Sequence, residues 1–291
     1  MVASVINIYN ITIKIMQILK MERKDYPAVG EVVYQTTLQN GLRVFLLPKQ
    51  DFNETYGIMT ANFGSIDTSF IPRGSNQAVQ YPAGVAHFLE HKLFEDENGQ
   101  DLLQQFVELG AESNAFTSFT KTSYLFSATD NILENVRLLQ SLLENAYFTE
   151  ESVQREQGII QQEIDMYKDN PDYCLFFHTL ANLYPDTPLA EDIAGSVESI
   201  AEITVEDLDE NFETFYHPSN MSLLLIGNFD LEKTIAVIQE QHESLKGIDE
   251  ESLIRRFPLA LNPVISTGSV RMEVASSKLA IGLRGSQSLA G

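Results

Sequence analysis

Residues 81–96, "YPAGVAHFLEHKLFED", hold two histidines, His87 and His91, four positions apart. From Gly84 onward apolar residues recur at helical spacing, which predicts a helix across this stretch. Residues four apart lie on the same face of a helix, so both imidazoles can reach a single metal ion. Glu90, just before the second histidine, points close to the same side. The alternative interpretation is a solvated helix face on which the two histidines have no role.

The spacing H-x-x-E-H is the inverted form of the zinc-hydrolase motif, in which the histidines are ligands and the glutamate is the base. A hydrolytic zinc ion takes three protein ligands from His and Glu or Asp side chains, so a third ligand is needed. The predicted helix at 150–169 contains Glu156 and Glu163, which are two helical turns apart and therefore face the same way. A lone glutamate on such a helix is usually an exposed solubilising charge. Only the joint pattern favours a metal site.

The elements around the motif predict an α+β fold. Asn40-Gly41 lies between two β-prone runs and predicts a hairpin over 31–49. Strands are predicted within 55–65, 113–130 and 220–230, and helices lie between them without regular βαβ spacing. We therefore predict a mixed, largely antiparallel sheet covered by helices.

The chain divides into four predicted segments. The last of them contains two strand-like runs, at 268–275 and 277–284. The segments are a poorly ordered N-terminal extension (1–28), a zinc-bearing α+β domain (29–245), a linker (246–267) and the start of a second domain that is truncated (268–291).

The composition excludes several classes of partner. The formal net charge of −22 argues against nucleic acid and anionic membranes, because phosphate binding needs basic patches. No run of about 18 apolar residues is present, so we predict no membrane span. The single cysteine, Cys174, rules out an internal disulfide and fits a cytoplasmic protein. The remaining histidines, His178, His217 and His242, are predicted to lie outside any metal site.

The segments "HFLEH" and "EQGIIQQE" together resemble the pitrilysin/insulysin family of zinc metallopeptidases, and most of all its processing-peptidase-like bacterial branch. Members carry H-x-x-E-H followed by a downstream glutamate ligand, with a second glutamate seven residues before it. The resemblance implies that His87, His91 and Glu163 bind one Zn²⁺ per chain. It also implies that Glu90 is the general base and that Glu156 supports the site from outside the ligand set. The implied fold is the processing-peptidase-like (LuxS-metallohydrolase-like) half.

A further match lies in "SNAFTSF". In the family an Asn-Ala-aromatic-Thr strand borders the cleft, and the substrate peptide adds to it as another strand. The resemblance assigns substrate binding to Asn114, Ala115, Phe116 and Thr117. Main-chain hydrogen bonds hold an extended peptide in such an arrangement whatever its sequence. The alternative is an ordinary sheet strand.

The implied function is that of a zinc metalloendopeptidase or processing peptidase, which hydrolyses extended peptides with a zinc-activated water and Glu90 as general base. Family members close two similar halves around the peptide, so we expect a homo- or heterodimer with a related half. The chain stops where a second half would begin. The alternatives are therefore a truncated zinc- and peptide-binding fragment, or a non-catalytic subunit, which the intact H-x-x-E-H disfavours. Some similar bacterial members are associated, at family level only, with modification of elongation factor P.

Overall fold

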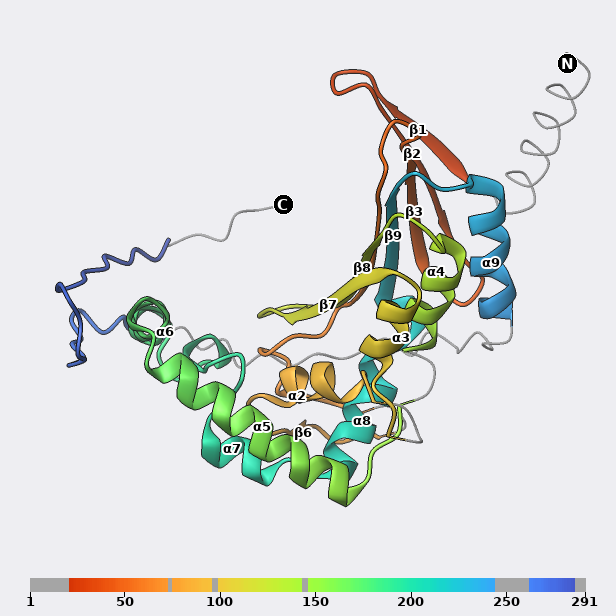
Figure 1. The fold of residues 1–291 in the computed structure, drawn as a ribbon. Helices are drawn as coiled ribbons and strands as arrows, with labels where there is room; N and C mark the ends of the chain where they lie inside the picture. Colours follow the sequence, from red (N-terminus) through yellow and green to blue (C-terminus); the bar gives the residue numbers. More distant parts are fainter. Residues whose placement is uncertain (1–20, 73–74, 96–98, 143–145, 244–261, 286–291) are drawn as a thin grey trace, which may run out of the picture.

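The computed structural model describes residues 21–72, 75–95, 99–142, 146–243 and 262–285. Its centre is a seven-stranded sheet in the order β1-β2-β3-β9-β4-β8-β7 (Figure 1). Neighbouring strands run antiparallel except β3 and β9, which run parallel. The predicted α+β fold with a mixed, largely antiparallel sheet is thus confirmed. The strands are β1 (Glu22–Tyr26), β2 (Glu31–Thr37), β3 (Arg43–Pro48), β4 (Thr55–Ala61), β7 (Ala111–Thr117), β8 (Thr122–Ala128) and β9 (Met221–Gly227).

The core lies on one face of the sheet. Alternate residues of the central strands are buried, as Met59 in β4, Tyr124 in β8 and Leu223 in β9 show. Because successive side chains of a strand point to opposite faces, the buried residues form rows on the face of the sheet that the helices cover. Helix α4 (Ile132–Ser141) packs on β4, β8 and α9 (Leu231–Glu243).

The remaining helices gather mainly at one end of the sheet. Figure 1 shows α2, α5, α7 and α8 together below β7 and β8, while α6 extends away from the sheet. Helix α2 contacts β7, β8, α5 and α8, so it lies between the sheet and the other helices. These elements are α2 (Val85–Lys92), α3 (Leu102–Glu108), α5 (Glu150–Lys168), α6 (Pro171–Leu183), α7 (Val197–Glu202) and α8 (Val205–Phe215), with short pieces β5 (Ser69–Phe70), β6 (Val79–Gln80), η1 (Pro188–Ala190) and η2 (Pro218–Asn220).

A close approach of two loops fixes the start of α2. Gly84 precedes the helix with φ of 93°, and a Cβ there would lie 2.5 Å from the carbonyl oxygen of Ala194. Only glycine fits both the conformation and the space. The Ser199 hydroxyl donates to the Ala83 carbonyl at 2.8 Å, which ties the same loop to α7. The helix that carries both histidines is therefore anchored at its first turn.

Polar side chains cap the starts of α5 and α6. Thr149 caps α5 through a capping box with Ser152, and Asn170 caps α6 with Pro171 in its first turn. Helix α4 begins after Asn131, whose φ is 52°. Asparagine tolerates this left-handed conformation, so it can end the turn that precedes the helix.

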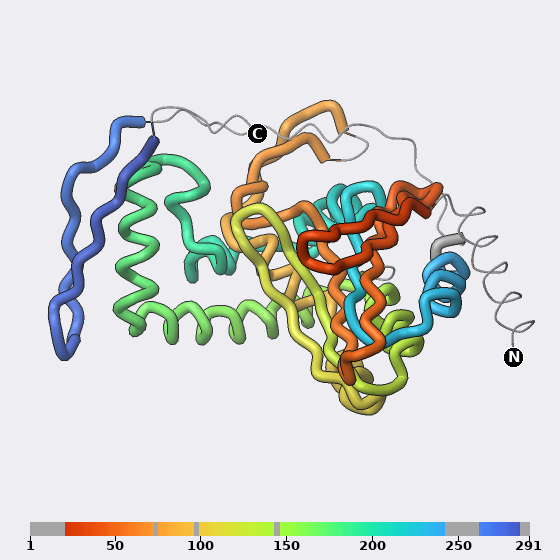
Figure 2. Tube along the Cα trace, turned by 90° about the horizontal axis from the view of Figure 1, so that it is seen from above, coloured from red at the N-terminus to blue at the C-terminus, as the bar shows by residue number. Residues whose placement is uncertain are grey.

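The two ends of the chain differ from the sequence prediction. Residues 22–26, inside the predicted N-terminal extension, form β1 and pair with β2, so the sheet begins earlier than predicted. Residues 1–20, most of the linker and the last six residues lie outside the described part. The runs 268–275 and 277–284 form an extended hairpin-like path beside α6 (Figure 2) but no strand, because no described strand pairs with them.

No helix in the described part of the chain is both long enough and apolar enough to span a membrane.

Candidate metal centre

Three side chains from two helices meet beside the sheet. His87 and His91 lie on α2 and Glu163 lies on α5, and one ligand atom from each can be chosen so that all lie within 4.8 Å of one another. Nε2 of His87 is 3.8 Å from Oε1 of Glu163, and Nε2 of His91 is 3.4 Å from Oε2. The structure thus brings together the three predicted ligands. No other such cluster of His, Cys, Asp and Glu occurs among the described residues.

The packing of both helices explains this meeting. On α2, Val85, Phe88 and Leu89 are buried, which turns the histidine face toward α5. On α5, Ile160 and Ile164 are buried next to the glutamates. Apolar contacts on both helices therefore determine where the polar side chains point.

Glu156 contacts the cluster from outside it. Its Oε1 atom lies 2.9 Å from Nδ1 of His91, and its side chain is only 12% exposed. A carboxylate that binds the second ring nitrogen fixes the tautomer and orientation of a ligating histidine. Glu156 thus contacts the three-residue cluster from outside it, and its supporting role remains a prediction. His87 differs, since its Nδ1 atom is buried with no hydrogen-bond partner among the described residues, so no carboxylate fixes its ring from that side.

The electrostatics of the cluster are those of a site built for a cation. Burial lowers the pKa of His91, but its interactions with Glu156 and Glu163 outweigh burial and raise the pKa to about 9. Burial, followed by the neighbouring His91, lowers the pKa of His87 to about 4. The interaction with His91 lowers the pKa of Glu163. Near neutral pH these shifts leave His91 as an imidazolium beside the carboxylate of Glu163, while His87 is neutral.

The donor set fits zinc. Two imidazoles and a carboxylate are the ligand types of hydrolytic zinc sites, which keep a further position open. A divalent cation would take the place of the His91 proton among the acidic groups. His87, His91 and Glu163 would hold the ion, and their role as ligands remains a prediction.

Glu90 adjoins the cluster on the same helix. It is 9% exposed, and burial raises the pKa of its carboxyl group above the ordinary value, opposed by a hydrogen bond from Thr117. The Thr117 hydroxyl donates this bond to Oε2 of Glu90. The family resemblance assigned Thr117 to the substrate strand. The sequence gave no sign of its contact with Glu90, which depends on how β7 packs against α2.

Strand β7 is an edge of the sheet as described. The amide of Ser118 donates to the carbonyl of Lys121 in the β7–β8 turn. Because hydrogen-bonded and non-hydrogen-bonded pairs alternate in an antiparallel ladder, the main-chain groups of Thr117, Ala115 and Ser113 point away from β8. These groups are placed to pair with an added strand.

The predicted substrate residues divide between the two faces of β7. Ala115 and Thr117 are half-buried, whereas Asn114 and Phe116 are exposed. Oδ1 of Asn114 accepts a hydrogen bond from the amide of Ala115 at 2.8 Å. One of the outward-pointing donors is therefore already covered by a side chain of the same strand.

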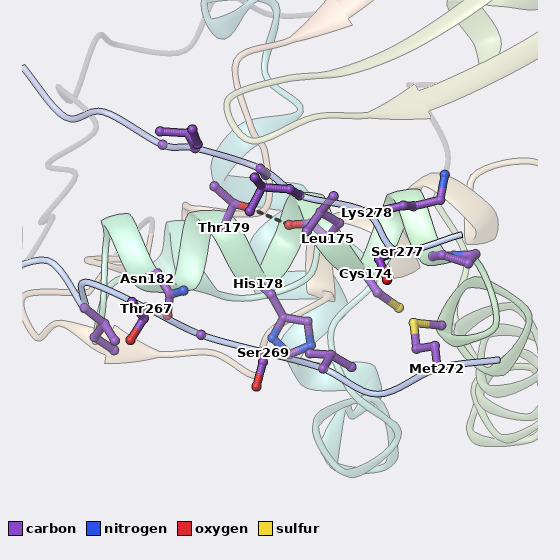
Figure 3. Close-up of a pocket in the computed structure, with 18 of the residues that line it drawn as sticks. Cys174, Leu175, His178, Thr179, Asn182, Thr267, Ser269, Met272, Ser277 and Lys278 are labelled. Carbon is purple, nitrogen blue, oxygen red and sulfur yellow. Dashed lines mark hydrogen bonds between the residues drawn. The ribbon is translucent and has the colours of Figure 1, made fainter. Parts of the chain in front are cut away.

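A separate cavity of about 910 Å³ lies between α6 and the segment 265–282. Figure 3 shows His178 and Asn182 of α6 facing Thr267 and Ser269 of that segment. Lys278 forms an ion pair with Asp172 at 2.8 Å across it. None of the metal-cluster residues lines this cavity, so it is distinct from the candidate centre.

Comparisons with known proteins agree with this architecture. Residues 69–197 match the insulinase family (peptidase family M16), and residues 202–288 match the M16 inactive domain. The zinc protease YmfH of Bacillus subtilis is 44% identical over 89% of this chain. A structure described as an M16-like peptidase from Alicyclobacillus acidocaldarius has a TM-score of 0.74 at 37% identity over 82% of this chain. A mitochondrial-processing peptidase subunit beta of Arabidopsis thaliana is more distant, at 28% identity over 81% of this chain.

The fold and the matched segments define the class as that of the M16-like peptidases. The chain belongs to the insulinase peptidase family, M16. It spans 61% of YmfH, 53% of the Alicyclobacillus chain and 43% of the Arabidopsis subunit. The relatives support a peptidase class for this chain.

Proposed function

We propose that this chain carries the zinc site and general base of a metalloendopeptidase that cleaves extended peptides. The observation that carries the proposal is the meeting of His87, His91 and Glu163 within 4.8 Å, with Glu90 beside them. When bound, zinc supplies Lewis acidity and lowers the pKa of water toward 7. The chain's own residues supply the remaining functions.

Glu90 is suited to move a proton. Its carboxylate is buried next to the metal cluster, and its raised pKa brings it closer to the working range of a general base. It would accept a proton from the attacking water and deliver it to the leaving amine nitrogen. The outward main-chain groups of β7 would hold the peptide as an added strand.

The proposed enzyme also needs a second half or subunit that covers the site. The edge of β7 is open, and Leu279, Ile281 and Leu283 are each at least 83% exposed among the described residues. These features support a related half or subunit that covers the site, in a homo- or heterodimer. Adding a separately produced related half should raise the cleavage rate if this is so, whereas unchanged rates at saturating concentration would contradict it.

Cleavage of an unstructured peptide library tests the proposal. Glu90→Gln should retain zinc and lose activity by about 100- to 10,000-fold, which is the usual contribution of a general acid–base group. Glu151→Gln, an exposed position in the first turn of α5, is the matched control and should remain active. Equal cleavage by Glu90→Gln and the parent protein would remove Glu90 from its role.

A further inference from the structure

The Glu90 carboxylate is held by a single side chain. The Thr117 hydroxyl donates to Oε2, and this is the one hydrogen bond that the described residues give this carboxylate. The two residues are 27 positions apart and belong to α2 and β7. The contact therefore exists only because the helix and the edge strand pack together.

A second hydroxyl lies near that of Thr117 and is the other possible acceptor of its proton. Thr122, directly opposite Thr117 in the ladder, is completely buried and donates its own proton to the carbonyl of Phe63 at 2.9 Å. Its oxygen lies 3.4 Å from the Thr117 hydroxyl and can only accept. Oε2 of Glu90 is closer to the Thr117 hydroxyl than Thr122 is, and a carboxyl oxygen is a good acceptor, so Glu90 takes the Thr117 proton.

The strand also places Thr117 relative to a peptide. Its side chain faces α2, while its main-chain groups point away from β8 toward the open edge of the sheet. One residue thus contacts the proposed base through its side chain and borders the proposed peptide path through its backbone.

We propose that Thr117 is a positioning residue that holds Glu90 by Oε2 and leaves Oε1 directed toward the reaction. This inference rests on the proposed function of Glu90. Thr117 would then position both the general base and the peptide, since its side chain holds Glu90 and its backbone borders the peptide path.

Kinetics on the zinc-loaded protein provide the first test. Thr117→Val should lower kcat by about tenfold to a hundredfold, as expected for a hydrogen bond to a charged group, and leave KM and zinc content nearly unchanged. Thr117→Ser should restore most of kcat, because it returns the hydroxyl. Thr60→Val is the control, since the Thr60 hydroxyl pairs with Ser123 in the same sheet and does not contact Glu90. It should leave kcat unchanged.

A measurement on the metal-free protein provides the second test. The carboxyl ¹³C resonance of Glu90, assigned with Glu90→Gln, should shift in Thr117→Val, remain in place in Thr60→Val and return in Thr117→Ser. An unshifted resonance in Thr117→Val would overturn the inference whatever the activity.

The two tests separate the possible failures. If the parent protein cleaves peptides and Thr117→Val cleaves them equally fast, the positioning role is wrong while the proposed function stands. If the resonance shifts as expected but the parent protein cleaves nothing at saturating zinc and partner, the contact is real and the proposed function is wrong. A merely structural role would lower stability in Thr117→Val and Thr117→Ser alike without separating kcat from KM.

Discussion

The imidazole of His91 links two glutamates of one helix. Its Nδ1 atom lies 2.9 Å from Oε1 of Glu156, and its Nε2 atom lies 3.4 Å from Oε2 of Glu163. The glutamates are two turns apart on α5, so a single ring on α2 spans both. The histidine is therefore oriented by Glu156 before a metal ion binds.

Replacement of Glu156 tests this orientation. Glu156→Gln keeps a hydrogen-bond acceptor but removes the charge, so zinc affinity should fall by about 10- to 100-fold without being abolished. Competition with a chelator of known affinity measures the change. Glu150→Gln, in the first turn of the same helix, should bind zinc as the parent protein does. An unchanged affinity in Glu156→Gln would show that the ring needs no such partner.

Zinc affinity should depend on pH through His91. In the metal-free protein its pKa is raised to about 9, so below that pH a proton must leave before the ring can bind a metal. Apparent affinity should therefore rise about tenfold per pH unit between pH 6 and 8 and level off near pH 9. His87, with its pKa lowered to about 4, is already neutral in this range and adds no dependence. Calorimetry in buffers of different ionisation enthalpy should find about one proton released per ion, and a pH-independent affinity would contradict this.

A buried lysine next to the motif should make Glu95 important for stability. The Lys92 side chain is completely buried and pairs with Glu95, which also binds the exposed Arg155 of α5 at 2.5 Å. Glu95→Gln leaves the buried ammonium without a counter-charge, which should cost about 3 kcal/mol of unfolding free energy. Arg155→Gln removes only an exposed partner and should cost about 0–1 kcal/mol. Urea unfolding measures the loss of unfolding free energy in each variant. Equal losses in Glu95→Gln and Arg155→Gln would contradict the prediction that the buried pair matters more.

Peptide binding at β7 should respond to Asn114. Its side chain occupies the amide of Ala115, which an added strand would otherwise use. Asn114→Ala removes this competition, so KM for an extended peptide should fall by about two- to tenfold, the value of one hydrogen bond. Steady-state kinetics measure it, with Glu112→Ala on the same exposed face as control. A higher KM in Asn114→Ala would mean that the side chain itself binds substrate.

The sequence predicted those features that depend on local spacing. The helix period alone predicted that His87 and His91 share one face and that Glu156 and Glu163 share another. The pairing of the two helices was implied by the family resemblance, and the structure brings these side chains together. Asn40-Gly41 likewise predicted the β2–β3 hairpin correctly. The contact of Thr117 with Glu90 could not be predicted, because it depends on tertiary packing of α2 against β7. The segment 268–284 was predicted to contain strands and forms none, because a strand-like pattern forms a strand only where a partner strand exists.

Zinc analysis of the purified protein tests the central claim most directly. Zinc should be present at about one ion per chain, because the described residues contain one suitable cluster. His87→Ala and Glu163→Gln should each lose the ion, while His178→Ala, an exposed histidine of α6, should retain it. Absence of zinc from the parent protein at saturating zinc, or full occupancy in both cluster variants, would contradict the assignment of His87, His91 and Glu163 as a metal centre.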